Sequence, residues 1–78
     1  MVRAEHDPTA DAVYVYLSDQ PYAFGEDLDH AQRVDYAADG TPIGVELLYV
    51  SGGVDLSDLP RADELASALE RLNIHQFA

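Results

Sequence analysis

Residues 31–50 read AQRVDYAADGTPIGVELLYV, in which two segments rich in apolar and β-branched residues stand on either side of Asp39-Gly40. Asp-Gly is favoured in a two-residue hairpin turn because both of its residues tolerate positive φ. Segments of this composition are typical of strands. The stretch therefore predicts an antiparallel hairpin formed by residues 31–37 and 42–50.

A two-residue turn also fixes which residues of the two strands lie opposite each other. It places an apolar ladder on one face of the hairpin and an ion pair on the other, and a slip of one residue would destroy both. The predicted pairs are Tyr36 with Ile43, Val34 with Val45 and Gln32 with Leu47 on the apolar face, and Arg33 with Glu46 on the other.

Residues 12–17 alternate between β-branched and aromatic residues, which predicts a strand with bulky side chains on both faces. A shorter alternation in residues 2–6 predicts a first strand, joined to it by a turn at residues 7–11. Residues 22–29 become acidic after a brief alternation, and we expect an irregular extended segment there. One face of the clearest strand carries Val13, Val15 and Leu17, and the other carries Ala12, Tyr14 and Tyr16.

Residues 52–60 are expected to be a turn segment that leads into a helix over about residues 61–73, with Pro60 suited to its first turn. Apolar residues recur there at helical spacing and form one stripe. Residues 74–78 are expected to add one apolar contact or to fray. The apolar stripe consists of Ala62, Leu65, Ala66, Leu69 and Leu72.

These elements predict a single α+β domain over residues 1–78. Its β-meander, of about four antiparallel strands, would occupy residues 1–51. The C-terminal amphipathic helix would then pack on one face of the sheet.

The chain has 78 residues, which is enough for one hydrophobic core and too few for a second. It has no cysteine, which excludes disulfides, thiolate metal ligands and cysteine nucleophiles. Domains of this size usually need reinforcement by a metal or a partner chain when disulfides are absent. We favour oligomerisation, and expect a homodimer, over an oxygen-ligated metal.

Fifteen acidic residues against four arginines give a formal net charge of −11. Such a surface repels phosphate backbones and anionic lipid heads, so we expect no nucleic-acid or membrane partner. It would attract a small basic protein or, weakly, divalent cations. Because the sequence has no apolar run of about 20 residues and no signal-peptide core, we expect a cytoplasmic location.

Asp7 and Asp11 lie on either side of Pro8 in the predicted turn. The favoured interpretation is structural, because Asx side chains commonly accept hydrogen bonds from turn amides. The alternative is a site for a hard cation, since carboxylate oxygens suit Ca²⁺ and Mg²⁺. The spacing differs from that of an EF-hand loop.

No catalytic or cofactor motif is recognisable, so we expect neither an enzyme nor a bound cofactor. The three histidines at positions 6, 30 and 75 show no zinc-ligand spacing. Tyr14, Asp35 and Glu46 share the predicted sheet face opposite the apolar ladder, where paired carboxylates could support acid/base chemistry. An ion pair between Arg33 and Glu46 is the simpler prediction.

Tyr14 and Tyr16 leave their strand on one face, and Leu48 is expected to join them there. Once the helix covers the other side of the sheet, this face stays amphipathic and aromatic. Tyrosine provides large contact area with a polar tip, which is typical of protein interfaces. We therefore predict a non-enzymatic interaction module, built on this tyrosine-bearing face or on an edge strand, with interface candidates Tyr14, Tyr16 and Leu48.

Three motifs follow one another in the chain: Asp7-Pro8-x-x-Asp11-Ala12-x-Tyr14-x-x-Leu17, Asp35-Tyr36-x-x-Asp39-Gly40 and Ile43-Gly44-Val45-Glu46-Leu47-Leu48. Their order and spacing over residues 4–51 resemble the YuzE-like family of small bacterial proteins, a domain of unknown function. His6, where the family commonly has tyrosine, and the polar Arg33 depart from the pattern. The resemblance implies a compact β-rich fold with a helix and a small toxin-like protein as partner. It implies no activity, substrate or catalytic residue.

Overall fold

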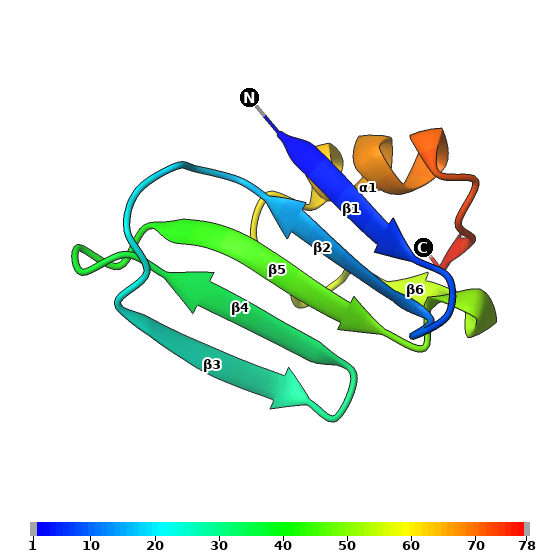
Figure 1. Cartoon of the computed structure of the whole chain (residues 1–78), viewed down its shortest axis with the longest axis horizontal. Helices are drawn as coiled ribbons and strands as arrows, with labels where there is room; N and C mark the ends of the chain where they lie inside the picture. The colour runs from blue at the N-terminus through cyan, green and yellow to red at the C-terminus, as the bar shows by residue number, and fades with distance from the viewer. Residues whose placement is uncertain (1, 78) are drawn as a thin grey trace.

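The computed structural model describes residues 2–77 and shows an α+β fold with a five-stranded antiparallel sheet, in the order β1-β2-β5-β4-β3 (Figure 1). This confirms the predicted fold class, with five strands in the sheet rather than four. One helix, α1 (Ala62–Arg71), packs on one side of the sheet. The strands are β1 (Arg3–Asp7), β2 (Ala12–Tyr16), β3 (Phe24–Asp29), β4 (Gln32–Tyr36) and β5 (Pro42–Leu48).

The fifth strand is β3, in the region where an irregular segment was predicted. It lies at the sheet edge farthest from α1 (Figure 1). Nearly all of its side chains are exposed on both faces, so its sequence lacks the apolar alternation that marks a half-buried strand. A register shift between Asp27 and Asp29 interrupts the alternation further.

The strand order differs from a simple meander because β2 pairs with β5 rather than with β3. Burial explains the order. The apolar residues of β2 and β5 are buried side by side, with Val15 opposite Val45 and both fully covered. The acidic β3 is left at an edge, where its carboxylates keep their hydration.

The register of the β4–β5 hairpin is as predicted for Gln32–Leu47, Arg33–Glu46 and Val34–Val45. Two features near the turn differ from the prediction, and their effects on the register cancel. The turn holds three residues, since the Ala37 amide donates to the Thr41 carbonyl at 2.9 Å and the Gly40 amide to the Ala37 carbonyl at 3.0 Å. A bulge then leaves Ile43 without a cross-strand partner, so Tyr36 lies opposite Pro42, and the predicted Tyr36–Ile43 pair is wrong.

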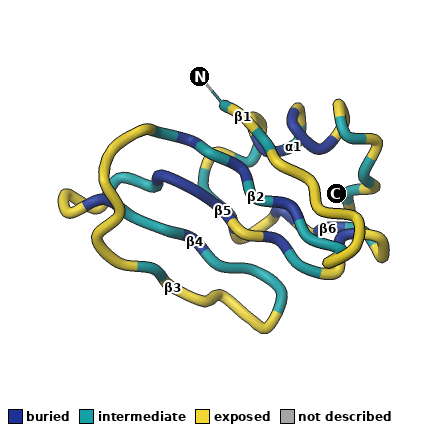
Figure 2. The backbone as a smooth tube through the Cα atoms, viewed as in Figure 1, coloured by how far each residue is buried: buried dark blue, intermediate teal, exposed yellow. Residues whose placement is uncertain are grey.

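The hydrophobic core lies between the sheet and α1 (Figure 2). The predicted inward face of β2 is confirmed, because Val13, Val15 and Leu17 are all buried. Leu65 and Leu69 of the predicted helical stripe are fully buried, and the remaining members, Ala62, Ala66 and Leu72, are partly buried against the same core.

The helix is shorter than predicted at both ends. Arg61 has a left-handed backbone (φ 53°), and its guanidinium donates to the Leu17 carbonyl at 3.0 Å and to Glu64, so it precedes the helix. Asn73 is also left-handed (φ 62°), and the Ile74 amide donates to the Leu69 carbonyl at 3.0 Å, which ends the helical hydrogen bonding.

Parts of the predicted turn segment and tail pair with each other. After the 3₁₀ turn η1 (Val50–Gly52), strand β6 (Val54–Asp55) pairs in parallel with β7 (Gln76–Phe77). The Gln76 side chain also donates to the Ala66 carbonyl at 3.0 Å, which ties this tail to α1. Two-residue strands carry no periodicity, so pairing between such distant segments has no local sequence signal.

Candidate interaction surface

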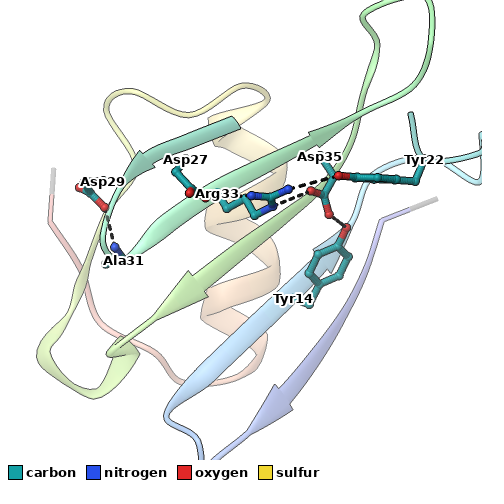
Figure 3. A network of polar contacts seen from close by, with 7 residues as sticks. All are labelled: Tyr14, Tyr22, Asp27, Asp29, Ala31, Arg33 and Asp35. Carbon is teal, nitrogen blue, oxygen red and sulfur yellow. Dashed lines mark hydrogen bonds and ion pairs between the residues drawn. The ribbon is translucent and has the colours of Figure 1, made fainter. Parts of the chain in front are cut away.

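The side of the sheet that faces away from α1, here called the open face, carries a polar network across three strands and one loop (Figure 3). The Tyr14 hydroxyl donates to the Asp35 carboxylate at 2.7 Å. The Arg33 guanidinium donates to Asp35 at 3.2 Å, to Asp27 at 3.1 Å and to the Tyr22 hydroxyl at 3.2 Å. The network therefore joins β2, β4, β3 and the loop before β3.

Two glycines make room for this network. Tyr14 and Asp35 belong to strands on opposite sides of β5, and the tyrosine ring lies across Gly44 to reach the carboxylate. A Cβ at Gly44 would overlap the Tyr14 hydroxyl, and a Cβ at Gly25 would overlap the Arg33 guanidinium. The long side chains thus lie flat on the sheet because the strands beneath them have no side chain at these points.

Arg33 lies opposite Glu46 in register, yet its guanidinium pairs with Asp27 and Asp35. The predicted Arg33–Glu46 ion pair is therefore wrong. Arg33 leans away from β5 and toward β3, because Gly25 leaves space on that side and Asp27 is its direct partner on β3.

The protonation states of Tyr14 and Arg33 are fixed near neutral pH. Burial raises the pKa of Tyr14, and its hydrogen bond to the Asp35 carboxylate raises it further. Hydrogen bonds to Asp27, Tyr22 and Asp35 raise the pKa of Arg33. Tyr14 therefore stays neutral and Arg33 stays charged, so this pair suits a structural network better than proton transfer.

The second tyrosine of the open face, Tyr16, also has its hydroxyl engaged. It donates to the Glu5 carboxylate at 2.9 Å, and Arg3 lies over its ring with the guanidinium carbon 4.1 Å from the ring centre. The rings of Tyr16 and Tyr14 meet edge to face at 4.7 Å. The two tyrosines predicted as interface candidates lie side by side, as expected. Their hydroxyl groups form hydrogen bonds within the sheet.

Leu48, the third interface candidate, lies opposite Ala12 on the same face. It is half-buried and lines a hollow of about 120 Å³ together with His30, Arg33 and Glu46. Its apolar surface is thus partly covered by its own neighbours.

Asp7 and Asp11 build the turn region in different ways. Asp7 Oδ1 accepts the amides of Thr9 at 3.0 Å and Ala10 at 3.1 Å. Asp11 instead accepts the amide of Ser51 at 2.9 Å and its hydroxyl at 2.7 Å, which ties the β1–β2 turn to the segment after β5. Within residues 2–77, no group of three or more histidine, aspartate or glutamate side chains is arranged to hold a metal ion.

Two of the three histidines, His6 and His75, line the same hollow although they are far apart in the sequence. The hollow has a volume of about 360 Å³ and lies between the β1–β2 turn and the end of α1. His75 packs edge to face on Phe77, while His30 lies beside Tyr49 elsewhere on the surface.

The sequence reasoning missed an apolar group at β3. Among residues 2–77, five large hydrophobic side chains are exposed, and three of them lie within residues 22–28: Tyr22 at 57%, Phe24 at 47% and Leu28 at 38%. The Phe24 ring stacks on Tyr36 with centroids 5.1 Å apart, on the side of the sheet that faces the core. The available signal was the persistence of three large apolar residues in an acidic segment.

The backbone of β3 adds to this surface. As an outer strand it pairs with β4 on one side only, so alternate amide and carbonyl groups point away from the sheet. Exposed apolar side chains beside an unpaired strand edge are features of a protein-binding surface. We call residues 22–29 the β3 edge.

The described part of the chain contains no helix that is long and apolar enough to cross a membrane. The chain matches no curated protein and no solved structure. A family model described as "Protein of unknown function (DUF2283)" matches residues 3–51, which span all five strands of the main sheet and the start of η1. This range nearly coincides with that of the predicted resemblance, whose YuzE-like name stays a prediction. The chain therefore belongs to the family of proteins of unknown function DUF2283.

Proposed function

We propose that this protein is a non-enzymatic protein-interaction module and that the β3 edge is its contact surface. The observation that carries the proposal is the concentration of exposed Tyr22, Phe24 and Leu28 in and just before a strand whose outer side is unpaired. A strand of this kind binds partners through backbone hydrogen bonds, and its side chains supply specificity.

The open-face network stabilises the β3 edge through contacts from the neighbouring strand β4. Arg33 reaches from β4 to Asp27 in β3 and to Tyr22 in the preceding loop, so it holds the β3 edge at two separate points. A surface that is ordered before binding loses less conformational entropy when a partner arrives. Tyr14 and Tyr16 belong to β2, which β5 and β4 separate from β3, and both are less exposed than Tyr22.

The proposal is tested by affinity purification from the native host with the full chain as bait. A Tyr22→Ser, Leu28→Ser double variant removes apolar area from the β3 edge. A Tyr49→Ser, Phe77→Ser double variant removes exposed aromatic residues outside residues 22–29 and serves as the control. We expect proteins retained by the wild type to be lost from the first variant and kept by the second. Equal retention by both variants would refute the role of β3.

A further inference from the structure

We propose that the partner at the β3 edge is an extended, basic segment of another protein, which adds to the sheet as a further strand beside β3. This inference rests on the proposed function and names the chemistry of its partner. It follows from the charge of the edge, the geometry of the strand and the alternation of its side chains.

The second half of the β3 edge is negative, because its acidic residues all lie within residues 26–29. Glu26, Asp27 and Asp29 are all exposed, and six residues of strand thus carry three carboxylates. The cation beside them is Arg33, which is shared between Asp27 and Asp35. Arg3 and Arg61 are paired with their own neighbours, Glu5 and Glu64. A partner that brings lysine or arginine would therefore complement this edge.

A second copy of this chain is a poor occupant of the same edge. A dimer across β3 would be symmetric, so each strand would bring the same carboxylates, Glu26, Asp27 and Asp29, to the shared boundary. Like charges opposite each other destabilise a strand pair, and the net charge of −11 adds repulsion at longer range. Homodimerisation through another surface stays a prediction.

The side chains of β3 indicate what the incoming strand should carry on each face. Gly25 and Asp27 lie on the open face, opposite Asp35 and Arg33. Phe24 lies on the other face, stacked on Tyr36. Glu26 lies on the same face as Phe24, opposite Val34. An added strand with basic residues on that face and apolar residues on the open face would place lysines beside Glu26, away from the Arg33 that already pairs with Asp27.

The opposite sheet edge provides an internal comparison. β1 is also an outer strand, but α1 lies against it, and its two carboxylates, Glu5 and Asp7, are accompanied by Arg3, which pairs with Glu5. A basic strand should therefore select β3 over β1, which backbone pairing alone would not explain.

The probe is a capped peptide of alternating lysine and valine, about eight residues long, which is an ordinary strand length. One control peptide has glutamate in place of lysine, and a second keeps the lysines but has proline at two central valine positions. Binding is followed by the backbone amide shifts of the full chain in NMR spectra. We expect saturable shifts at Phe24–Asp29 with the lysine peptide, and binding weaker by about tenfold or more with either control.

Charge reversal in the protein separates local attraction from attraction to the whole molecule. Glu26→Lys and Glu70→Lys change the net charge equally, but Glu70 lies on the exposed side of α1. We expect the first to weaken binding of the lysine peptide by about tenfold and the second by less than about twofold. Equal effects, shifts at β1, or equal binding of the proline peptide would each overturn the inference.

The two proposals fail in different ways. If the β3 double variant loses its host partners while the lysine peptide does not bind, the contact surface stands and the basic partner is wrong. If the β3 double variant keeps its host partners and the lysine peptide causes no shifts in β3, both proposals are wrong. Sedimentation velocity completes the test, because a dimer that Glu26→Lys strengthens would show that a second copy occupies β3.

Discussion

The Tyr14 hydroxyl donates a hydrogen bond of 2.7 Å to the Asp35 carboxylate across β5, where the absent side chain of Gly44 leaves the path open. Through Asp35 and Arg33 this contact is continuous with Asp27 of β3. The proposed contact surface is thus supported from the middle of the sheet (Figure 3).

Gly44→Ala should destabilise the protein, because the new Cβ would overlap the Tyr14 hydroxyl and displace it from Asp35. We expect the free energy of unfolding in urea to fall by about 1–3 kcal/mol, as for other insertions into closely packed sites. Gly52→Ala is the matched control. A Cβ at Gly52 meets no atom within 4 Å, so its effect should stay within about 0.5 kcal/mol. Equal effects of the two substitutions would contradict the close approach at Gly44.

The raised pKa of Tyr14 predicts a loss of stability in alkali. Above the ordinary tyrosine pKa of about 10, the unfolded chain loses the proton while folded Tyr14 keeps it, so the free energy of unfolding falls as pH rises. Below that pH, Tyr14 is protonated in both the folded and the unfolded state, and its contribution to the free energy of unfolding is fully present. We expect Tyr14→Phe to show a smaller fall than the wild type when urea unfolding is repeated across this range. Tyr49→Phe, at an exposed position, should behave like the wild type.

Gly40→Val should weaken the β4–β5 hairpin, because Gly40 has a φ of 86° that β-branched residues avoid. No atom lies within 4 Å of the added Cβ, so the cost is backbone strain of about 1–2 kcal/mol. Gly40→Asn should cost less, since asparagine tolerates this region. Thermal unfolding of the two variants measures the difference, and an unchanged Gly40→Val protein would show that the turn is wrongly described.

Divalent cations should leave the β1–β2 turn unperturbed. Asp7 Oδ1 and both carboxylate oxygens of Asp11 already accept hydrogen bonds, from Thr9, Ala10 and Ser51. We expect the amide shifts of those three donors to stay constant during titration with Ca²⁺ and with Mg²⁺. Saturable movement of all three would favour the alternative of a weak cation site.

The parts of the fold that could be predicted from the sequence are those that depend on local patterns, such as turn residues and the periodicity of apolar residues. The β4–β5 register follows from the position of the Asp-Gly turn and from the apolar ladder, and it survives a longer turn because the bulge at Ile43 restores it. The buried faces of β2 and α1 follow from periodicity.

The parts that the sequence does not reveal depend on distant neighbours. β3 is exposed on both faces, so pairing with β4 rather than burial defines it. The partners of Arg33 depend on the space above Gly25, which belongs to another strand. The interface residues were therefore predicted to be Tyr14, Tyr16 and Leu48, while three of the five exposed large hydrophobic residues among residues 2–77 are Tyr22, Phe24 and Leu28.

The most direct test of the central claim is amide hydrogen exchange of the full chain, measured with and without the partner recovered from the native host. A strand added beside β3 would take up its outward-facing amides and slow their exchange. The account predicts new protection within Phe24–Asp29 and none within Arg3–Asp7. Protection of β1 alone, or unchanged exchange in β3, would contradict it.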